Sequence, residues 1–317
     1  LPNTAGVSSP YTNNAKMRTK GWELSVSWRD KLSNGLGYGA TLVMSDAMST
    51  ILSYPNETNN ISKYYRGRKL GEIWGYETNG LAKTDEEMKS HLASLPNGGQ
   101  NALGTNWAAG DIMYKDLNGD GKIDGGQGVL GNTGDRKVIG NETPRYNFGL
   151  TLHAEYKGFD FRIFFQGTLK RDKWLTGLNM WGADGGYWQS TCLKENMDYF
   201  RPADTDSYFG PNVNGYLPRP LLGASANNNK QVNSQYLQDA SYMRCKNIQL
   251  GYTFPKQWIS NWGLQNMRMF VSAENLFVIT GLKAGAYDPE VLDGYAAGSG
   301  KAAPLKTAIS FGLNVSL

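Results

Sequence analysis

The chain contains 317 residues, with 32 basic and 28 acidic side chains and a formal net charge of +4. This balance lacks the basic excess of a nucleic-acid-binding protein. Hydrophobic residues make up 40% of the sequence, but the longest apolar runs, such as residues 276–279, fall far short of the roughly 20 residues of a membrane helix. A helical membrane protein is therefore excluded, whereas strands that alternate apolar and polar side chains are compatible with this composition.

Alternating residues predict seven β-strands, six of them in hairpins. In chain order, the strands are expected at residues 17–29, 36–45, 145–156, 159–168, 241–254, 266–277 and 306–317. Asn34–Gly35 and Lys157–Gly158 provide turns for the first two hairpins, and residues 255–265 connect the third. The last strand alternates without a break from Ile309 to Leu317.

The predicted strands have one apolar and one polar face. The apolar face, expected to meet lipid, includes Trp22, Phe161, Leu250 and Leu313. The polar face carries the charged residues Glu23, Arg29, Arg145, Glu155, Asp160, Arg162, Arg268 and Glu274. Strict alternation places Arg244 and Lys246 on the apolar face as exceptions. They would then lie above the hydrocarbon or meet anionic lipid head groups.

The connections between strands differ strongly in length. Within hairpins they are short, whereas roughly 99, 72 and 27 residues separate the hairpins and the last strand. Since consecutive antiparallel strands place all short connections on one side, this asymmetry predicts a membrane barrel with short periplasmic turns and long extracellular loops. Seven strands would leave unpaired edges, so other strands are expected to complete the barrel. A soluble β-rich glycan-binding module is the alternative.

Residues 116–124, with the sequence DLNGDGKID, form a motif suited to a hard cation. Oxygen ligands alternate along it and a glycine occupies the sharp turn, as in Ca²⁺-binding loops. The candidate ligands are Asp116, Asn118, Asp120, the Lys122 carbonyl and Asp124. The twelfth position is Gln127, which cannot supply a bidentate carboxylate. An Asx turn without an ion is the alternative.

Several segments together resemble a known family, in the family's order along the chain. They are residues 73–76, 110–124, 134–146, 241–255, 271–277 and 309–317. The family is that of the SusC/RagA-like TonB-dependent outer-membrane transporters of Bacteroidota. Two departures occur: residues 125–134 are inserted before Asp135, and Leu317 replaces the aromatic residue that often ends such barrels. Asp135 thereby becomes an additional candidate ligand for the ion.

The resemblance implies that residues 1–317 are the C-terminal part of an all-β transmembrane barrel of about 22 strands with a plugged lumen. The plug domain and the N-terminal strands would lie outside this chain. It further implies location in the cell outer membrane and active import of nutrient oligomers, either glycan or peptide fragments. The TonB complex would energise import through the absent N-terminal part, and a SusD-like surface lipoprotein would cover the long loops.

Aromatic residues gather in the second long connection. Trp174, Trp181, Tyr187 and Trp188 are candidates for contact with substrate or with the lipoprotein. Alternatively, these side chains fold the loop onto itself. Residues 49–106 and 170–238 are the expected docking surface of the lipoprotein.

An enzyme is not expected. His91 and His153 are the available general bases; His91 follows a capping-box sequence at residues 84–87, and His153 falls in the middle of a strand. Neither is accompanied by a nucleophile elbow or a zinc-binding spacing. A passive porin is the nearer alternative to active transport, and an outer-membrane hydrolase is the more distant one.

Overall fold

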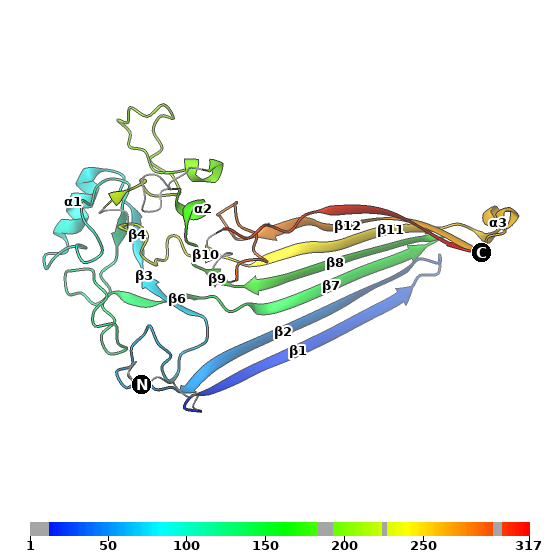
Figure 1. The fold of residues 1–317 in the computed structure, drawn as a ribbon, viewed down its shortest axis with the longest axis horizontal. Coiled ribbons are helices and arrows are strands. Elements are labelled where there is room, and N and C mark those ends of the chain that lie inside the picture. Colours follow the sequence, from blue (N-terminus) through cyan, green and yellow to red (C-terminus); the bar gives the residue numbers. More distant parts are fainter. Residues whose placement is uncertain (1–12, 183–192, 224–226, 294–299) are drawn as a thin grey trace, which may run out of the picture.

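The computed structural model describes residues 13–182, 193–223, 227–293 and 300–317. Its main element is a seven-stranded antiparallel sheet in the order β1-β2-β7-β8-β11-β12-β13 (Figure 1). The strands are β1 Lys16–Lys31, β2 Gly37–Ser53, β7 Arg145–Tyr156, β8 Phe159–Lys170, β11 Tyr242–Thr253, β12 Asn266–Thr280 and β13 Ala308–Ser316. All seven predicted strands are confirmed, and β2 extends furthest beyond its predicted end.

The register of the sheet confirms that the apolar residues share one face. Leu250 pairs with Phe161 on β8 and with Val271 on β12, which in turn pairs with Phe311 on β13. Because side chains alternate along a strand, this face, called here the outer face, includes the predicted set. Its exposed side chains include Trp22, Leu24, Trp28, Leu152, Phe159, Phe161, Leu250, Met269, Ile309, Phe311 and Leu313. Most of the predicted charged residues lie on the opposite, inner face. Arg145 is the exception, because its guanidinium pairs with Asp46, which lies opposite Trp22 of the outer face.

A β-bulge in β11 changes the predicted orientation of Arg244. The pairing of β11 with both neighbours shifts between Cys245 and Asn247. Against β8, Lys246 is the extra residue, whereas against β12 the two residues 275 and 276 lie opposite Lys246. Alternation therefore continues out of phase, and Arg244 lies opposite Gln166 on the inner face. Its side chain is 4% exposed.

The acidic partners of these two cations lie in the connection between β12 and β13. Arg244 forms ion pairs with Asp288 and Glu290, and Lys246 Nζ lies 3.0 Å from Glu290 Oε1. The prediction that Arg244 and Lys246 lie on the apolar face is therefore wrong. The extra residue of the bulge, which no turn or glycine signal marks in the sequence, is the cause.

Short and long connections lie at opposite ends of the sheet (Figure 1). The short turns are residues 32–36, 157–158 and 254–265, the last containing α3 Lys256–Ile259 and η4 Ser260–Trp262. The first long loop, residues 54–144, contains β3 Glu72–Tyr76, β4 Thr78–Leu81, α1 Asp85–Ala93, β5 Ile112–Tyr114 and β6 Arg136–Asn141. The second long loop, residues 171–241, contains β9 Asp172–Lys173, α2 Leu178–Trp181, η2 Lys194–Met197 and β10 Gln238–Asp239. The third loop comprises residues 281–307.

Helix α1 begins as its sequence predicts. Thr84 is the N-cap, and its hydroxyl accepts a hydrogen bond of 3.1 Å from the Glu87 N–H. The Glu87 carboxylate accepts a 2.6 Å hydrogen bond from the N–H of Lys83, the residue before the N-cap. The helix buries Met88 against its own loop.

The three loops share a hydrophobic core and together form the loop domain. This core contains Tyr76, Leu95, Ile112, Tyr114 and Ile123 of the first loop, Leu175, Met180, Trp181, Leu217, Tyr236 and Ala240 of the second, and Tyr287 and Leu292 of the third. Burial of this surface offsets the conformational entropy lost when such long segments become ordered. Within the described residues, no helix combines the length and apolarity needed to cross a membrane.

Candidate functional site

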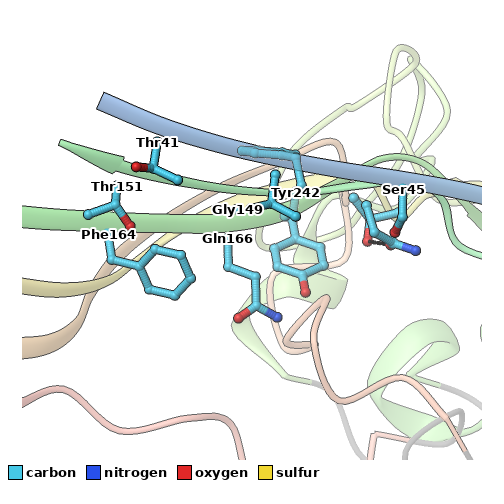
Figure 2. A pocket seen from close by; sticks show the side chains of 12 residues that line it. Thr41, Ser45, Gly149, Thr151, Phe164, Gln166 and Tyr242 are labelled. Carbon is cyan, nitrogen blue, oxygen red and sulfur yellow. Dashed lines mark hydrogen bonds between the residues drawn. The ribbon is translucent and has the colours of Figure 1, made fainter. Parts of the chain in front are cut away.

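The inner face of the sheet carries a hollow of about 390 Å³ near the loop domain. Strands β2, β7, β8 and β11 supply its lining, which is Thr41, Val43, Ser45, Asn147, Phe148, Gly149, Thr151, Phe164, Gln166, Gly167, Thr168 and Tyr242. Figure 2 shows the side chains of Phe164, Gln166 and Tyr242 projecting from one side of the strands. Hydroxyl, amide and aromatic groups thus meet here, and none of the lining residues is charged. Such groups suit an uncharged, hydrogen-bonding ligand.

The inner face is charged further toward the short turns. His153 pairs with Arg162 in the sheet register, and Glu155 pairs with Asp160. The Asp160 carboxylate also binds Arg268 on β12, with 3.0 Å between Asp160 Oδ2 and Arg268 Nε. The hollow is therefore the neutral part of the inner face, and the part beside the turns is charged.

The third loop packs against the neutral part of the inner face. Arg244 lies two residues from Tyr242, which lines the hollow, and its guanidinium is neutralised by Asp288 and Glu290. The Asp288 carboxylate also accepts a 3.0 Å hydrogen bond from the Leu305 N–H. These contacts connect residues near both ends of the third loop and neutralise the charge of Arg244 beside the hollow.

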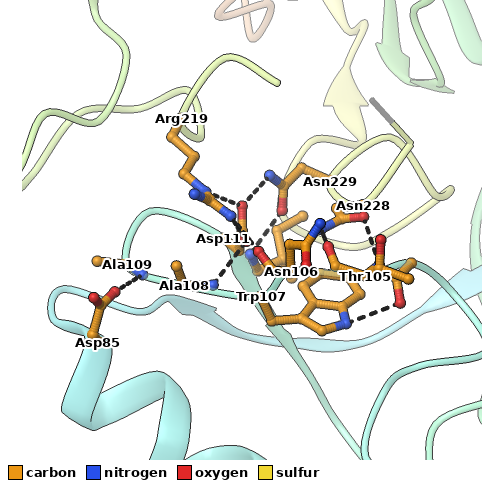
Figure 3. Close-up of polar contacts among 12 residues, drawn as sticks. Asp85, Thr105, Asn106, Trp107, Ala108, Ala109, Asp111, Arg219, Asn228 and Asn229 are labelled. Carbon is orange, nitrogen blue, oxygen red and sulfur yellow. Dashed lines mark hydrogen bonds and ion pairs between the residues drawn. The ribbon is translucent and has the colours of Figure 1, made fainter. Parts of the chain in front are cut away.

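Asp111 joins the first and second long loops (Figure 3). Its side chain is 0% exposed, and Arg219 of the second loop donates to both of its carboxylate oxygens, at 2.8 and 2.7 Å. Asn229 Nδ2 and the Ala108 N–H also donate to this carboxylate, at 2.8 and 3.0 Å. A buried carboxylate with a bidentate arginine and two further donors is fully satisfied. The sequence analysis missed this site because its members are far apart in the chain.

The predicted cation ligands in residues 116–124 bond to the backbone of their own turn. Asp116 accepts hydrogen bonds from the N–H groups of Gly119 and Gly121, at 2.6 and 2.9 Å. The Asn118 side-chain oxygen accepts from the Asp120 N–H at 3.0 Å. These are the Asx turns that the alternative interpretation describes.

Asp135, which follows the inserted residues 125–134, contacts this loop. Its carboxylate is 0% exposed and accepts 2.8 Å hydrogen bonds from the N–H groups of Leu117 and Asp124. Burial raises the pKa of Asp135, whereas a hydrogen bond from Lys122, with Nζ and Oδ2 2.7 Å apart, lowers the pKa of Asp124.

The residue types in this loop are those that bind a hard cation. Their side chains, however, are not arranged around a common point. Among the described residues, no three carboxylate, imidazole or thiol side chains converge in a metal-binding arrangement. An ion would have to displace the Lys122 ammonium from Asp124 and take oxygens from backbone N–H groups. Bound Ca²⁺ stays a prediction.

The predicted aromatic contact residues lie partly inside the loop domain. Trp181 is 9% exposed, and its ring centroid lies 5.9 Å from that of Trp174 and 5.1 Å from that of Tyr236. These contacts favour the alternative that the aromatics fold the loop onto itself. A contact with another molecule through Trp181 would require the loop to open. Tyr187 and Trp188 lie outside the described residues.

The chain has relatives among TonB-dependent receptors. It is 27% identical over 304 residues to TonB-dependent receptor P3 of Formosa agariphila, an alignment that covers 92% of this chain and 27% of the relative. It is 27% identical over 208 residues to TonB-dependent receptor SusC of Bacteroides thetaiotaomicron, covering 65% of this chain and 17% of SusC. No family model matches the chain.

The fold matches a solved transporter. The structure of the RagAB peptide transporter superimposes with a TM-score of 0.66 and 18% identity, over 99% of this chain and 31% of the RagAB chain. The resemblance to SusC/RagA-like TonB-dependent transporters is confirmed. The chain spans less than a third of the length of these SusC/RagA-like relatives.

The two histidines lie in different parts of the molecule, His91 in the first long loop and His153 in the sheet. His91 Nε2 lies 3.2 Å from Gln100 Oε1, and burial lowers the pKa of His91. His153 lies in the middle of β7 on the inner face, as predicted. The SusC/RagA-like relatives are named as receptors or transporters, in agreement with the expectation of a non-enzyme.

Proposed function

We propose that this chain forms part of the membrane barrel of an outer-membrane nutrient importer. The outer face would meet lipid, the inner face would line the lumen, and the loop domain would lie outside the cell. The complete barrel would have about 22 strands and a plug, both supplied largely by residues outside this chain. Glycan or peptide fragments would be the cargo, and the TonB complex would energise their import.

The division of the sheet into an apolar and a polar face carries this proposal. Large apolar side chains on the outer face stay exposed, among them Phe311 at 84% and Trp28 at 62%. A soluble protein seldom exposes an apolar surface that spans seven strands. In a bilayer the same surface would be buried, and polar lumen residues would alternate with it.

The strand pairing supports completion of the sheet by other strands. In the described residues, β1 and β13 each pair on one side only. Unpaired backbone N–H and C=O groups are very costly within a lipid bilayer. Partner strands for β1 and β13 are therefore part of the proposal.

Energised uptake distinguishes this function from a passive porin. The full-length protein would be expressed in a Bacteroidota strain that lacks its own copy, and uptake of labelled glycan and peptide fragments would be measured before and after collapse of the proton-motive force. We expect uptake of the cargo to stop after the collapse. Uptake that continues at the original rate would favour a passive porin.

A surface lipoprotein of the SusD type is the proposed partner, docked on residues 49–106 and 170–238. The shared core of the loop domain supports this, since it gives a partner one ordered surface in place of three separate loops. Purification in mild detergent, followed by mass spectrometry, tests the partner. A transporter that is intact and active yet carries no lipoprotein would contradict this part of the proposal.

A further inference from the structure

The second long loop carries a projecting segment with an exposed aromatic pair. Residues 201–212, called here the tip loop, are closed by backbone hydrogen bonds between Arg201 and Asn212 of 2.9 and 3.1 Å. Tyr208 is 96% exposed and Phe209 is 56% exposed. Their rings lie edge to face, with centroids 5.5 Å apart. The tip loop is the yellow-green segment that stands above the rest of the loop domain in Figure 1.

Contacts within the second loop hold the tip loop in one conformation. Arg201 donates to the Gly210 carbonyl at 2.6 Å and to the Met197 carbonyl at 3.0 Å. Its guanidinium carbon also lies 4.7 Å from the Tyr199 ring centroid and 6.0 Å from that of Phe209. A loop held this way loses little backbone entropy when a partner binds it.

The charge and shape of the tip loop indicate which partner it fits. Asp204 and Asp206 precede the aromatic pair in the tip loop, are exposed and form no ion pair with a described residue. Two carboxylates disfavour the phosphate groups of a lipid surface. The aromatic rings project outward, whereas small ligands such as sugars bind mainly in concave sites. Projecting aromatic side chains are typical anchors of protein interfaces.

We propose that the tip loop inserts Tyr208 and Phe209 into an apolar pocket, rimmed by lysine or arginine, on the surface lipoprotein that covers the transporter. This inference rests on the proposed function and moves the expected contact from residues 174–188 to residues 201–212. Asp204 and Asp206 then meet the basic rim and set the orientation of the partner.

Affinity measurements test the tip loop directly. The probe is the lipoprotein that co-purifies with the full-length wild-type transporter, purified separately after identification by mass spectrometry. Its Kd would be measured for the wild type, for the double variant Tyr208→Ser/Phe209→Ser and for Asp204→Lys/Asp206→Lys. Leu130→Ser is the matched control, because Leu130 is 41% exposed and lies in the first long loop.

We expect the Kd to rise at least about tenfold for the aromatic variant and to stay within about twofold for Leu130→Ser. The charge variant should also bind more weakly, and it should lose the salt dependence of the wild type. An unchanged Kd for the aromatic variant overturns the tip-loop proposal and leaves the proposed function intact. If no lipoprotein co-purifies with an active wild type, the partner and the tip-loop proposal both fail.

A photocrosslinking amino acid in place of Tyr208 gives a second, independent readout. Crosslinks in whole cells should reach the same lipoprotein, whereas the same amino acid in place of Leu130 should not. Crosslinks from position 208 to lipopolysaccharide or to a glycan, in place of the lipoprotein, would overturn the proposal. Because the Tyr208 side chain is almost fully exposed, its replacement removes no interior packing.

Discussion

Asp111 lies where the two long loops meet, and its carboxylate has four donors. Replacement by alanine would remove the acceptor of Asn229 Nδ2 and would leave Arg219 with the Asn106 carbonyl but no carboxylate. Removing one member of such a buried pair costs about 3 kcal/mol. We therefore expect Asp111→Ala to raise the rate of loop-domain cleavage by an added protease about 100-fold in the full-length protein.

The matched control is Asp206→Ala, which removes the same charge from an exposed position. This variant should be cleaved at the wild-type rate. Equal cleavage of Asp111→Ala and the wild type would show that the loop domain does not depend on this contact.

The Lys122 ammonium competes with a cation for the Asp124 carboxylate in the Asp-rich turn. Its ammonium occupies Asp124 Oδ2 at 2.7 Å, a position that a Ca²⁺ ion would need. If the turn binds Ca²⁺, Lys122→Gln should lower the Kd for Ca²⁺ by up to about tenfold, and Asp116→Asn should weaken binding strongly. Hydrogen exchange of residues 116–135 across a Ca²⁺ titration measures both effects. Exchange that does not respond to Ca²⁺ in any variant would leave the ion-free Asx turn.

At the scale of the elements, the bulge in β11 anchors the third loop. The extra residue turns Arg244 to the inner face, where it forms ion pairs with Asp288 and Glu290. Arg244→Ala would leave the 7% exposed Asp288 side chain without its cation, at a cost of about 3 to 5 kcal/mol. We expect faster hydrogen exchange in residues 281–293, with the sheet itself unaffected. Lys306→Ala, at an exposed position of the same loop, is the control and should leave the exchange unchanged.

Alternation in the sequence predicts the strands because a sheet with two different faces needs a period of two residues. The prediction from alternation is confirmed for Leu250 and Phe161, which share the outer face. It failed at Arg244, because a bulge adds one residue and reverses the faces of those before it. Asp111 and Arg219 were not connected by any pattern, since 108 residues separate them and only the folded loops bring them together.

At the scale of the whole molecule, two neighbouring residues of β7 test the assignment of faces. Leu152 lies on the outer face and Thr151 lines the inner hollow. In a bilayer, Leu152→Arg should cost about 2 to 4 kcal/mol, whereas Thr151→Arg should be tolerated in the polar lumen. Urea titration of the full-length protein in lipid vesicles measures the difference.

Uptake separates the two variants further. Thr151→Arg should assemble at the wild-type level and import less cargo, because the arginine adds bulk and charge to the neutral hollow. Equal stability of both variants in vesicles would mean that the outer face does not meet lipid.

The core of the loop domain has a consequence for the order of biogenesis. Tyr76, Tyr236 and Tyr287 belong to loops that leave three different places in the sheet. Their packing therefore has to wait until β2, β7, β8, β11, β12 and β13 have taken their places side by side. A protease-resistant loop domain would then appear only on fully assembled molecules, so that stalled insertion intermediates remain open to degradation at their outer end.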